Sequence, residues 1–179
     1  MKIIKGKKEL HNLTLSAMFL AMSFVLPLFT GQIQQIGSML CPMHIPVLLC
    51  GFICGAPWGF LVGFIAPVLR SFIMGMPPMF PTAVSMTFEL ATYGFIAGLL
   101  YNKLPKKRVY VYTILLVAMI LGRVARGAAL FACLGFDTTK FGFGVFMSTV
   151  VLQSVPGIIV QIILVPLVVI AYGKNYKRK

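Results

Sequence analysis

Acidic side chains are almost absent from this chain, which has 3 aspartate and glutamate residues among 179. Enzymes that use general acid–base chemistry need clustered Asp, Glu or His. Within the apolar part of this chain only Glu89 and His44 are available, and nothing in the sequence pairs them. A Walker motif is also missing, so the chain does not itself hydrolyse ATP. We therefore expect a protein that is not an enzyme.

The few cysteines do not form a recognisable metal motif. Cys50 and Cys54 share a helix face, and His44 is the only further ligand candidate near them. A structural zinc site needs four ligands, so we interpret the cysteines as buried apolar thiols. No metal and no cofactor are expected. The four cysteines are Cys41, Cys50, Cys54 and Cys133.

Hydrophobic residues dominate what is present. They make up 59% of the chain against 11% charged residues, and the mean hydropathy is +0.96. Soluble domains have roughly half apolar and a quarter charged residues, so lipid must be the solvent here. One membrane crossing takes about 20 apolar residues. We predict an all-α integral membrane protein, a bundle of six transmembrane helices in one domain over residues 1–179. The expected helices span residues 12–29, 43–54, 58–74, 82–101, 110–134 and 145–172, with a proline-rich loop at 75–81.

The net charge of +13 comes from lysines and arginines gathered in three clusters, not spread over a face. With six crossings, all three clusters fall on one side of the membrane, and the positive-inside rule makes that side cytoplasmic. We therefore expect a multi-pass protein of the cell membrane with cytoplasmic N- and C-termini. Contact with anionic lipid explains the charge better than nucleic acid does. The clusters are Lys2, Lys5, Lys7, Lys8; Lys103, Lys106, Lys107, Arg108; and Lys174, Lys177, Arg178, Lys179.

Four ionisable residues fall inside predicted helices, where a charge is costly unless it faces a partner, water or a cavity. They are Arg70, Glu89, Arg123 and Arg126, and helix polarity places all four in the extracellular half. An internal salt-bridge network is one interpretation, with Glu89 pairing one arginine. It leaves two arginines unpaired, so a pocket for an anionic ligand is the favoured hypothesis. Further candidate polar groups of the pocket are His44, Gln153, Thr87 and Thr92.

Small residues form two stripes. Gly51, Gly55, Gly59 and Gly63 are four apart, and we expect them to pack the second helix against the third. Ala17 and Ala21 are one turn apart on the first helix and form a flat stripe that another helix can approach closely. That helix belongs either to a partner or to this protein's own bundle.

The chain resembles the S components of energy-coupling factor (ECF) transporters over nearly its whole length. Ala17-Met18-Phe19-Leu20-Ala21 matches the family's Ala-x-x-x-Ala motif. The apolar segment from Met43 to Gly55, with Pro46 inside it, is similar to the family's second helix, although Ala56 intrudes before Pro57. The stretch from Phe88 to Ala91 is similar to a polar segment of the family's fourth helix. The alanine motif alone is common in membrane helices.

The resemblance implies a subunit that binds a vitamin or vitamin precursor from outside. It then docks by the Ala17 and Ala21 face on a transmembrane coupling subunit driven by two cytoplasmic ATPases, and topples to release the substrate inside. The surplus of arginine favours an anionic ligand, since guanidinium suits carboxylate and phosphate. Pantothenate is the first candidate, and riboflavin, pyridoxine-type, queuosine-precursor and folate ligands remain open.

Three alternatives stay open from the sequence. A stand-alone secondary transporter or channel is one, but such proteins often contain inverted repeats, and we find no repeat. A membrane-embedded enzyme is disfavoured by the lack of clustered catalytic residues. A structural subunit without a ligand is the third.

Overall fold

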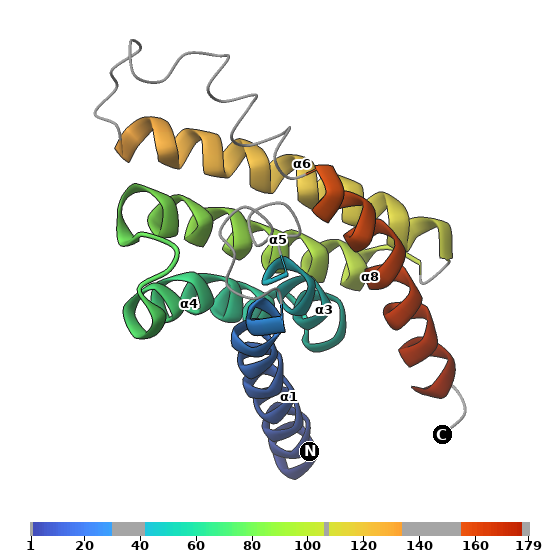
Figure 1. Ribbon diagram of the computed structural model, residues 1–179. Helices are drawn as coiled ribbons and strands as arrows, with labels where there is room; N and C mark the ends of the chain where they lie inside the picture. Colours follow the sequence, from blue (N-terminus) through green and yellow to red (C-terminus); the bar gives the residue numbers. More distant parts are fainter. Residues whose placement is uncertain (1, 30–41, 106–107, 134–154, 177–179) are drawn as a thin grey trace.

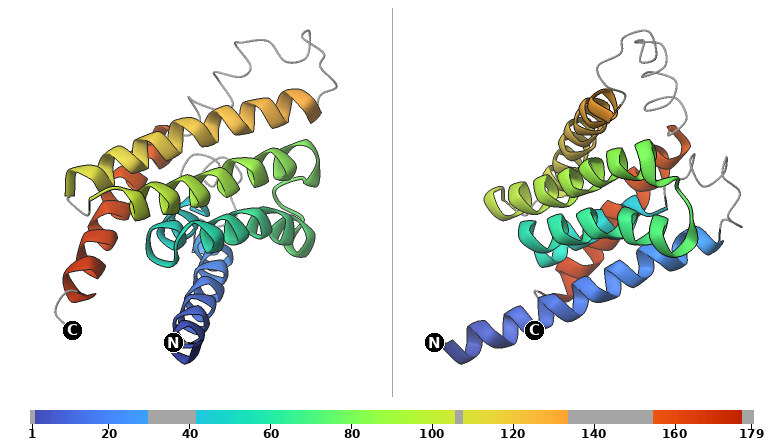
Figure 2. Two further views of the ribbon diagram at one scale, coloured as in Figure 1. Left: turned by 180° about the vertical axis from the view of Figure 1, so that it is seen from behind. Right: turned by 90° about the vertical axis from the view of Figure 1, so that its left-hand side faces the viewer.

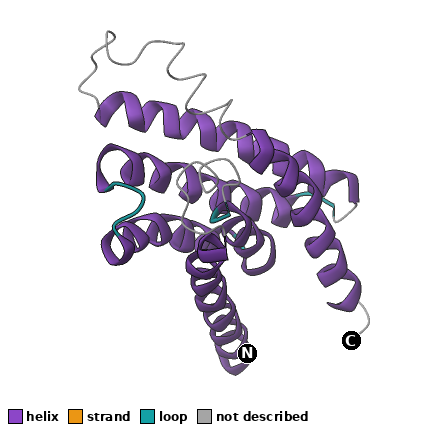
Figure 3. Ribbon diagram, viewed as in Figure 1, coloured by secondary structure: helices purple, strands orange, loops and turns teal. Residues whose placement is uncertain are grey.

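The computed structural model describes residues 2–29, 42–105, 108–133 and 155–176, and the regular structure in this part of the chain is entirely helical (Figure 3). It contains six α-helices and one short π-helix. The elements are α1 (Lys2–Phe29), α3 (His44–Cys54), α4 (Ala56–Met74), the π-helix η1 (Met79–Ala83), α5 (Val84–Lys103), α6 (Arg108–Cys133) and α8 (Val155–Tyr176). The predicted all-α fold with six helices is confirmed.

The helix boundaries differ from the predicted ones mainly at two places. α1 begins at Lys2 and not at residue 12, because the basic N-terminal segment contains helix-forming residues and no proline. The predicted loop at 75–81 is shorter than expected, because η1 already begins at Met79 and leads into α5. The predicted last helix began at 145, and its part before residue 155 lies outside the described residues.

α4, α5 and α6 lie side by side in chain order, while α1 and α8 cross them at an angle (Figure 1). α3 packs against α1, α4, α5 and α8, which places it inside the bundle. Ten of its 11 residues are buried. The N- and C-terminal ends of the chain lie on the same side of the molecule in each view (Figures 1 and 2).

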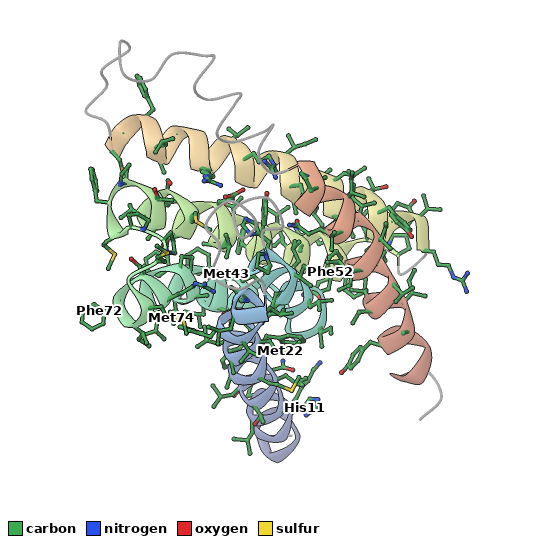
Figure 4. All side chains as sticks on the ribbon, viewed as in Figure 1. His11, Met22, Met43, Phe52, Phe72 and Met74 are labelled. Carbon is green, nitrogen blue, oxygen red and sulfur yellow. The ribbon has the colours of Figure 1, made fainter. Side chains whose placement is uncertain are left out.

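Five helices, α1, α4, α5 with η1, α6 and α8, are long and apolar enough to cross a membrane. Their outward faces carry many exposed large hydrophobic side chains. Phe72 on α4 is an example, since it is 82% exposed and points away from the bundle (Figure 4). α3 rises only about 16 Å, or half of a hydrocarbon core. Because neighbouring helices bury it, α3 need not match the thickness of the lipid.

Glycines bring α3, α4 and α5 into backbone contact. A methyl group added at Gly51 or Gly59 would lie 2.5 or 2.6 Å from the carbonyl oxygen of Gly94 on α5. One at Gly63 would overlap the Leu90 carbonyl. The expected contact between the two glycine-bearing helices is present, because the Cα of Gly51 would lie 2.7 Å from a methyl at Gly59. The prediction missed α5, whose own glycine completes a three-helix junction.

Two glycines with positive φ end α3 and α4. Gly55 has φ of 97° and forms the tight turn between the two helices, while Gly75 caps α4 with φ of 69°. L-residues with side chains rarely adopt these conformations, so glycine is needed there. The Gly55 turn keeps α3 and α4 adjacent.

Candidate functional site

The Glu89 carboxylate on α5 is the centre of a buried polar cluster. It is 0% exposed, and three helices supply its partners. The Tyr93 hydroxyl donates to Oε1 at 3.0 Å from one turn further along α5, and Arg126 Nη1 on α6 donates to Oε2 at 3.1 Å. His44 Nε2, at the start of α3, lies 3.5 Å from Oε2. The sequence did not pair Glu89 with His44, and the structure does.

Tyr93 is held against both neighbours of Glu89. Its ring lies 5.3 Å from that of His44, with a tilt of 60°. On the α6 side there is no room for a methyl group between Gly122 and the Tyr93 ring. Sequence reasoning missed Tyr93, although its position four residues after Glu89 places both side chains on one helix face.

A second arginine of α6 belongs to the same neighbourhood. Arg123 lies one turn before Arg126, and its charge acts on the Glu89 carboxylate. Charged side chains in an apolar bundle are costly unless they face a partner, water or a cavity. Within the described residues, Glu89 is the carboxylate on which both arginines act.

Several buried polar atoms make no hydrogen bond within the described part of the chain. In the cluster they are Nε of Arg126 and the ring nitrogens of His44, of which Nε2 lies 3.5 Å from Glu89. On α8 they are both amide atoms of Gln161, which no described contact joins to the cluster. Each buried polar atom without a partner costs about 1–3 kcal/mol. A ligand with matching donors and acceptors would remove this cost.

The sequence analysis named Gln153 as a candidate, but this residue lies outside the described residues. It did not name Gln161. Gln161 is 1% exposed and lies on the buried stripe of α8 between Gly157 and Val165. The sequence could have indicated Gln161, because it is the lone polar residue in the run from Ile158 to Leu164. An uncharged amide is a weaker signal than an intramembrane arginine, since amides often only join helices.

Arg70 makes no described contact with the Glu89 cluster. Its Nε donates to the Met76 carbonyl oxygen at 3.2 Å, and the adjacent Ser71 hydroxyl donates to that of Pro77 at 2.6 Å. Both residues tie the loop after Gly75 back onto α4. The Nη1 atom of Arg70 is buried and has no hydrogen-bond partner among the described residues.

The two candidate threonines are satisfied within their own helix. Thr87 donates to the Ala83 carbonyl at 2.8 Å, and Thr92 donates to that of Phe88 at 2.7 Å. Thr92 is half-buried and lies with Pro57, Phe60 and Phe95 along an apolar groove of about 290 Å³. Neither hydroxyl faces the Glu89 cluster in any described contact.

The cysteine pair lies at the contact of α1 with α3. Cys50 and Cys54 are buried free thiols, and Cys50 Sγ is 3.6 Å from the Ser16 hydroxyl. Among the described residues no group of three or more His, Cys, Asp or Glu side chains could hold a metal ion.

Ala17 and Ala21 on α1 are exposed. They lie on the face of α1 that points away from the bundle, together with Leu13, Met18 and Val25, whereas Phe19 and Ser23 are buried. The alanine stripe therefore does not pack against this protein's own described helices.

The long apolar helices define a multi-pass membrane protein, and the charged cluster is buried between them. The family described as ECF transporter, substrate-specific component, matches residues 11–169, so the chain belongs to this family. It is thus a transporter subunit and not an enzyme, and it works with a substrate and an energising module. No curated protein and no solved structure matches the chain.

Proposed function

We propose that this chain binds an anionic vitamin or vitamin precursor from outside the cell and delivers it through an ECF-type importer. Pantothenate, which carries one carboxylate, is the first candidate. The ligand lies among Glu89, Arg123, Arg126 and His44, and Gln161 contributes a further polar group. Arg70 holds the loop beside this region.

The observation that carries this proposal is the buried polar cluster around Glu89 inside an apolar bundle. Arg126 pairs with Glu89 at 3.1 Å, while Arg126 Nε and His44 Nδ1 are buried and make no hydrogen bond within the described residues. Polar groups of this kind, placed in a mostly apolar pocket, orient a small ligand. An anion that reaches Arg126 Nε and His44 Nδ1 would complete the hydrogen bonding of both atoms.

Two features support the proposed route. Glu89 is the sixth residue of α5 and Arg126 lies in the last third of α6, so the cluster is in the half of the bundle away from basic Lys103 and Arg108. If the basic side is cytoplasmic, as the positive-inside rule favours, the cluster lies in the outer half. Both termini are then cytoplasmic, which agrees with their common side in Figure 2.

The exposed stripe of Ala17 and Ala21 supports docking on a transmembrane coupling subunit. Small side chains allow two helix backbones to approach closely in lipid. Two cytoplasmic ATPases would drive the coupling subunit, since this chain lacks a nucleotide-binding motif of its own.

Mass spectrometry of small molecules retained by the detergent-purified protein tests the function. We expect one vitamin-like anion to co-purify, or pantothenate to bind in the nanomolar to micromolar range by calorimetry. If no vitamin or vitamin precursor is retained or bound, the proposal is wrong.

Single arginine variants test the site. Arg123→Ala and Arg126→Ala should each weaken binding by about 2–5 kcal/mol, because a buried anion loses its charged partner. Arg108→Ala, at the exposed start of α6, is the matched control and should bind normally. Unchanged affinity in both test variants would assign Arg123 and Arg126 to structure only.

A further inference from the structure

The N-terminal end of α3 is buried and has no side-chain cap. Met43 occupies the N-cap position without a side-chain hydrogen bond, and the first turn has no acidic residue. The N–H groups of Met43, His44 and Ile45 have no partner within the helix, while Pro46 has no N–H to offer. Met43, His44 and Ile45 are all buried. These amides and the helix dipole give this end a partial positive charge.

The shortness of α3 places this positive end inside the bundle. An 11-residue helix rises about 16 Å, whereas the hydrocarbon core is about 30 Å thick. The C-terminal end of α3 joins α4 at Gly55. Its N-terminal end therefore lies at a depth of the bilayer that the longer neighbouring helices cross. Transporters use half-helices of this kind to point amide groups at anionic substrates in the membrane.

The His44 side chain gives independent evidence for a ligand at this end. It is 1% exposed, and neither ring nitrogen makes a hydrogen bond within the described residues. Nε2 faces Glu89 at 3.5 Å, which leaves Nδ1 for another partner. An imidazole has two ring nitrogens, so His44 can contact Glu89 through Nε2 and a ligand oxygen through Nδ1.

We propose that the first turn of α3 and the His44 ring are the seat of the ligand's carboxylate. Backbone N–H groups of this turn and the free nitrogen of His44 bind its oxygens, and the charge of Arg126 balances it from α6. This assignment rests on the proposed function. It adds that α3 is the helix that binds the carboxylate of the ligand. The arginines compensate charge, and α3 fixes the position of the carboxylate.

Two ligands that differ in the carboxylate test the role of His44. Pantothenate and pantothenol, its neutral alcohol analogue, are titrated into the detergent-purified protein. We expect the wild type to prefer pantothenate at least tenfold. His44→Phe should reduce pantothenate affinity at least tenfold and change pantothenol affinity less than threefold, while His44→Gln, which keeps a donor, should recover part of the loss. His11→Phe replaces the other histidine, on the N-terminal part of α1 away from Met43 (Figure 4), and should behave as wild type.

Variants of Met43 test the helix end itself. Met43→Asn supplies a side-chain cap that competes for the same N–H groups. It should raise the melting temperature of the ligand-free protein and lower pantothenate affinity at least fivefold. Met43→Leu keeps an apolar side chain at this position and should change neither.

The outcomes separate the two proposals. Equal losses for pantothenate and pantothenol in His44→Phe, or unchanged pantothenate affinity in both His44→Phe and Met43→Asn, overturn the carboxylate seat and leave the function standing. If the wild type binds neither pantothenate nor biotin nor nicotinate, the carboxylate ligand class fails and the seat fails with it.

Discussion

Replacing Arg126 by methionine should strongly destabilise the protein, because it leaves the Glu89 carboxylate buried without its cationic partner. Glu89 is 0% exposed, and the ion pair at 3.1 Å is its shortest contact with a cation. Breaking a buried pair from one side costs about 3–5 kcal/mol. The Tyr93 hydrogen bond is present before and after the change, so it does not offset this loss.

The double variant Arg126→Met with Glu89→Gln removes both charges, and the new amide still accepts from Tyr93. It should lose only about 1–2 kcal/mol, which gives a coupling energy of at least 1 kcal/mol between the two positions. Equilibrium unfolding by SDS in mixed micelles, followed by circular dichroism, measures the free energy of unfolding of each variant. Arg108→Met, at the exposed start of the same helix, is the control and should stay within about 0.5 kcal/mol of wild type.

Additive effects would refute this reasoning. If the double variant loses as much as the two single variants together, Glu89 and Arg126 do not stabilise each other.

Two further predictions concern the glycine junction and the face of α1. Gly94→Ala should destabilise the protein by about 3 kcal/mol or more, because the new methyl overlaps backbone atoms of α4 that cannot rotate away. Gly173→Ala is the control and should not destabilise the protein, because open space surrounds Gly173. Equal free energies of unfolding for the two variants would contradict the glycine junction. Ala17→Trp and Ala21→Trp should abolish vitamin uptake in cells and leave ligand binding in detergent intact. Phe72→Trp, on the lipid-facing surface of α4, should retain uptake. Uptake that survives in both alanine variants would rule out this stripe as the docking face.

The number of helices and the presence of a charged site were predictable from the sequence. Long apolar runs are read directly as membrane spans, and Glu89 stands out because a carboxylate in such a run needs a partner. The pairing of Glu89 with an arginine was one of two interpretations of the sequence, which did not say which arginine it would be. That choice depends on how α6 rotates against α5, where Gly122 lets the helices approach at Tyr93.

Other parts of the site could not be predicted because they depend on contacts between distant segments. His44 contacts Glu89 only because α3 begins within the bundle and packs on α5. Arg70 was grouped with the other charges because helix polarity predicts how deep a residue lies in the membrane but not which way its side chain points. In the structure its guanidinium group donates to the Met76 carbonyl. Gly94 gave no signal because its partners lie on two other helices.

The glycine junction also determines which walls of the site can move. α3, α4 and α5 touch backbone to backbone, so His44 and Glu89 are carried by one rigid unit. Arg126 belongs to α6, whose Gly122 approaches both the Tyr93 ring and the Glu89 carbonyl oxygen. Gln161 belongs to α8, which meets the core through side chains such as Val165. Side chains can change rotamer, whereas contacting backbones cannot slide past each other without a clash. For the proposed ligand, displacement of α8 is therefore the expected route of entry and exit, while α3 and α5 stay fixed.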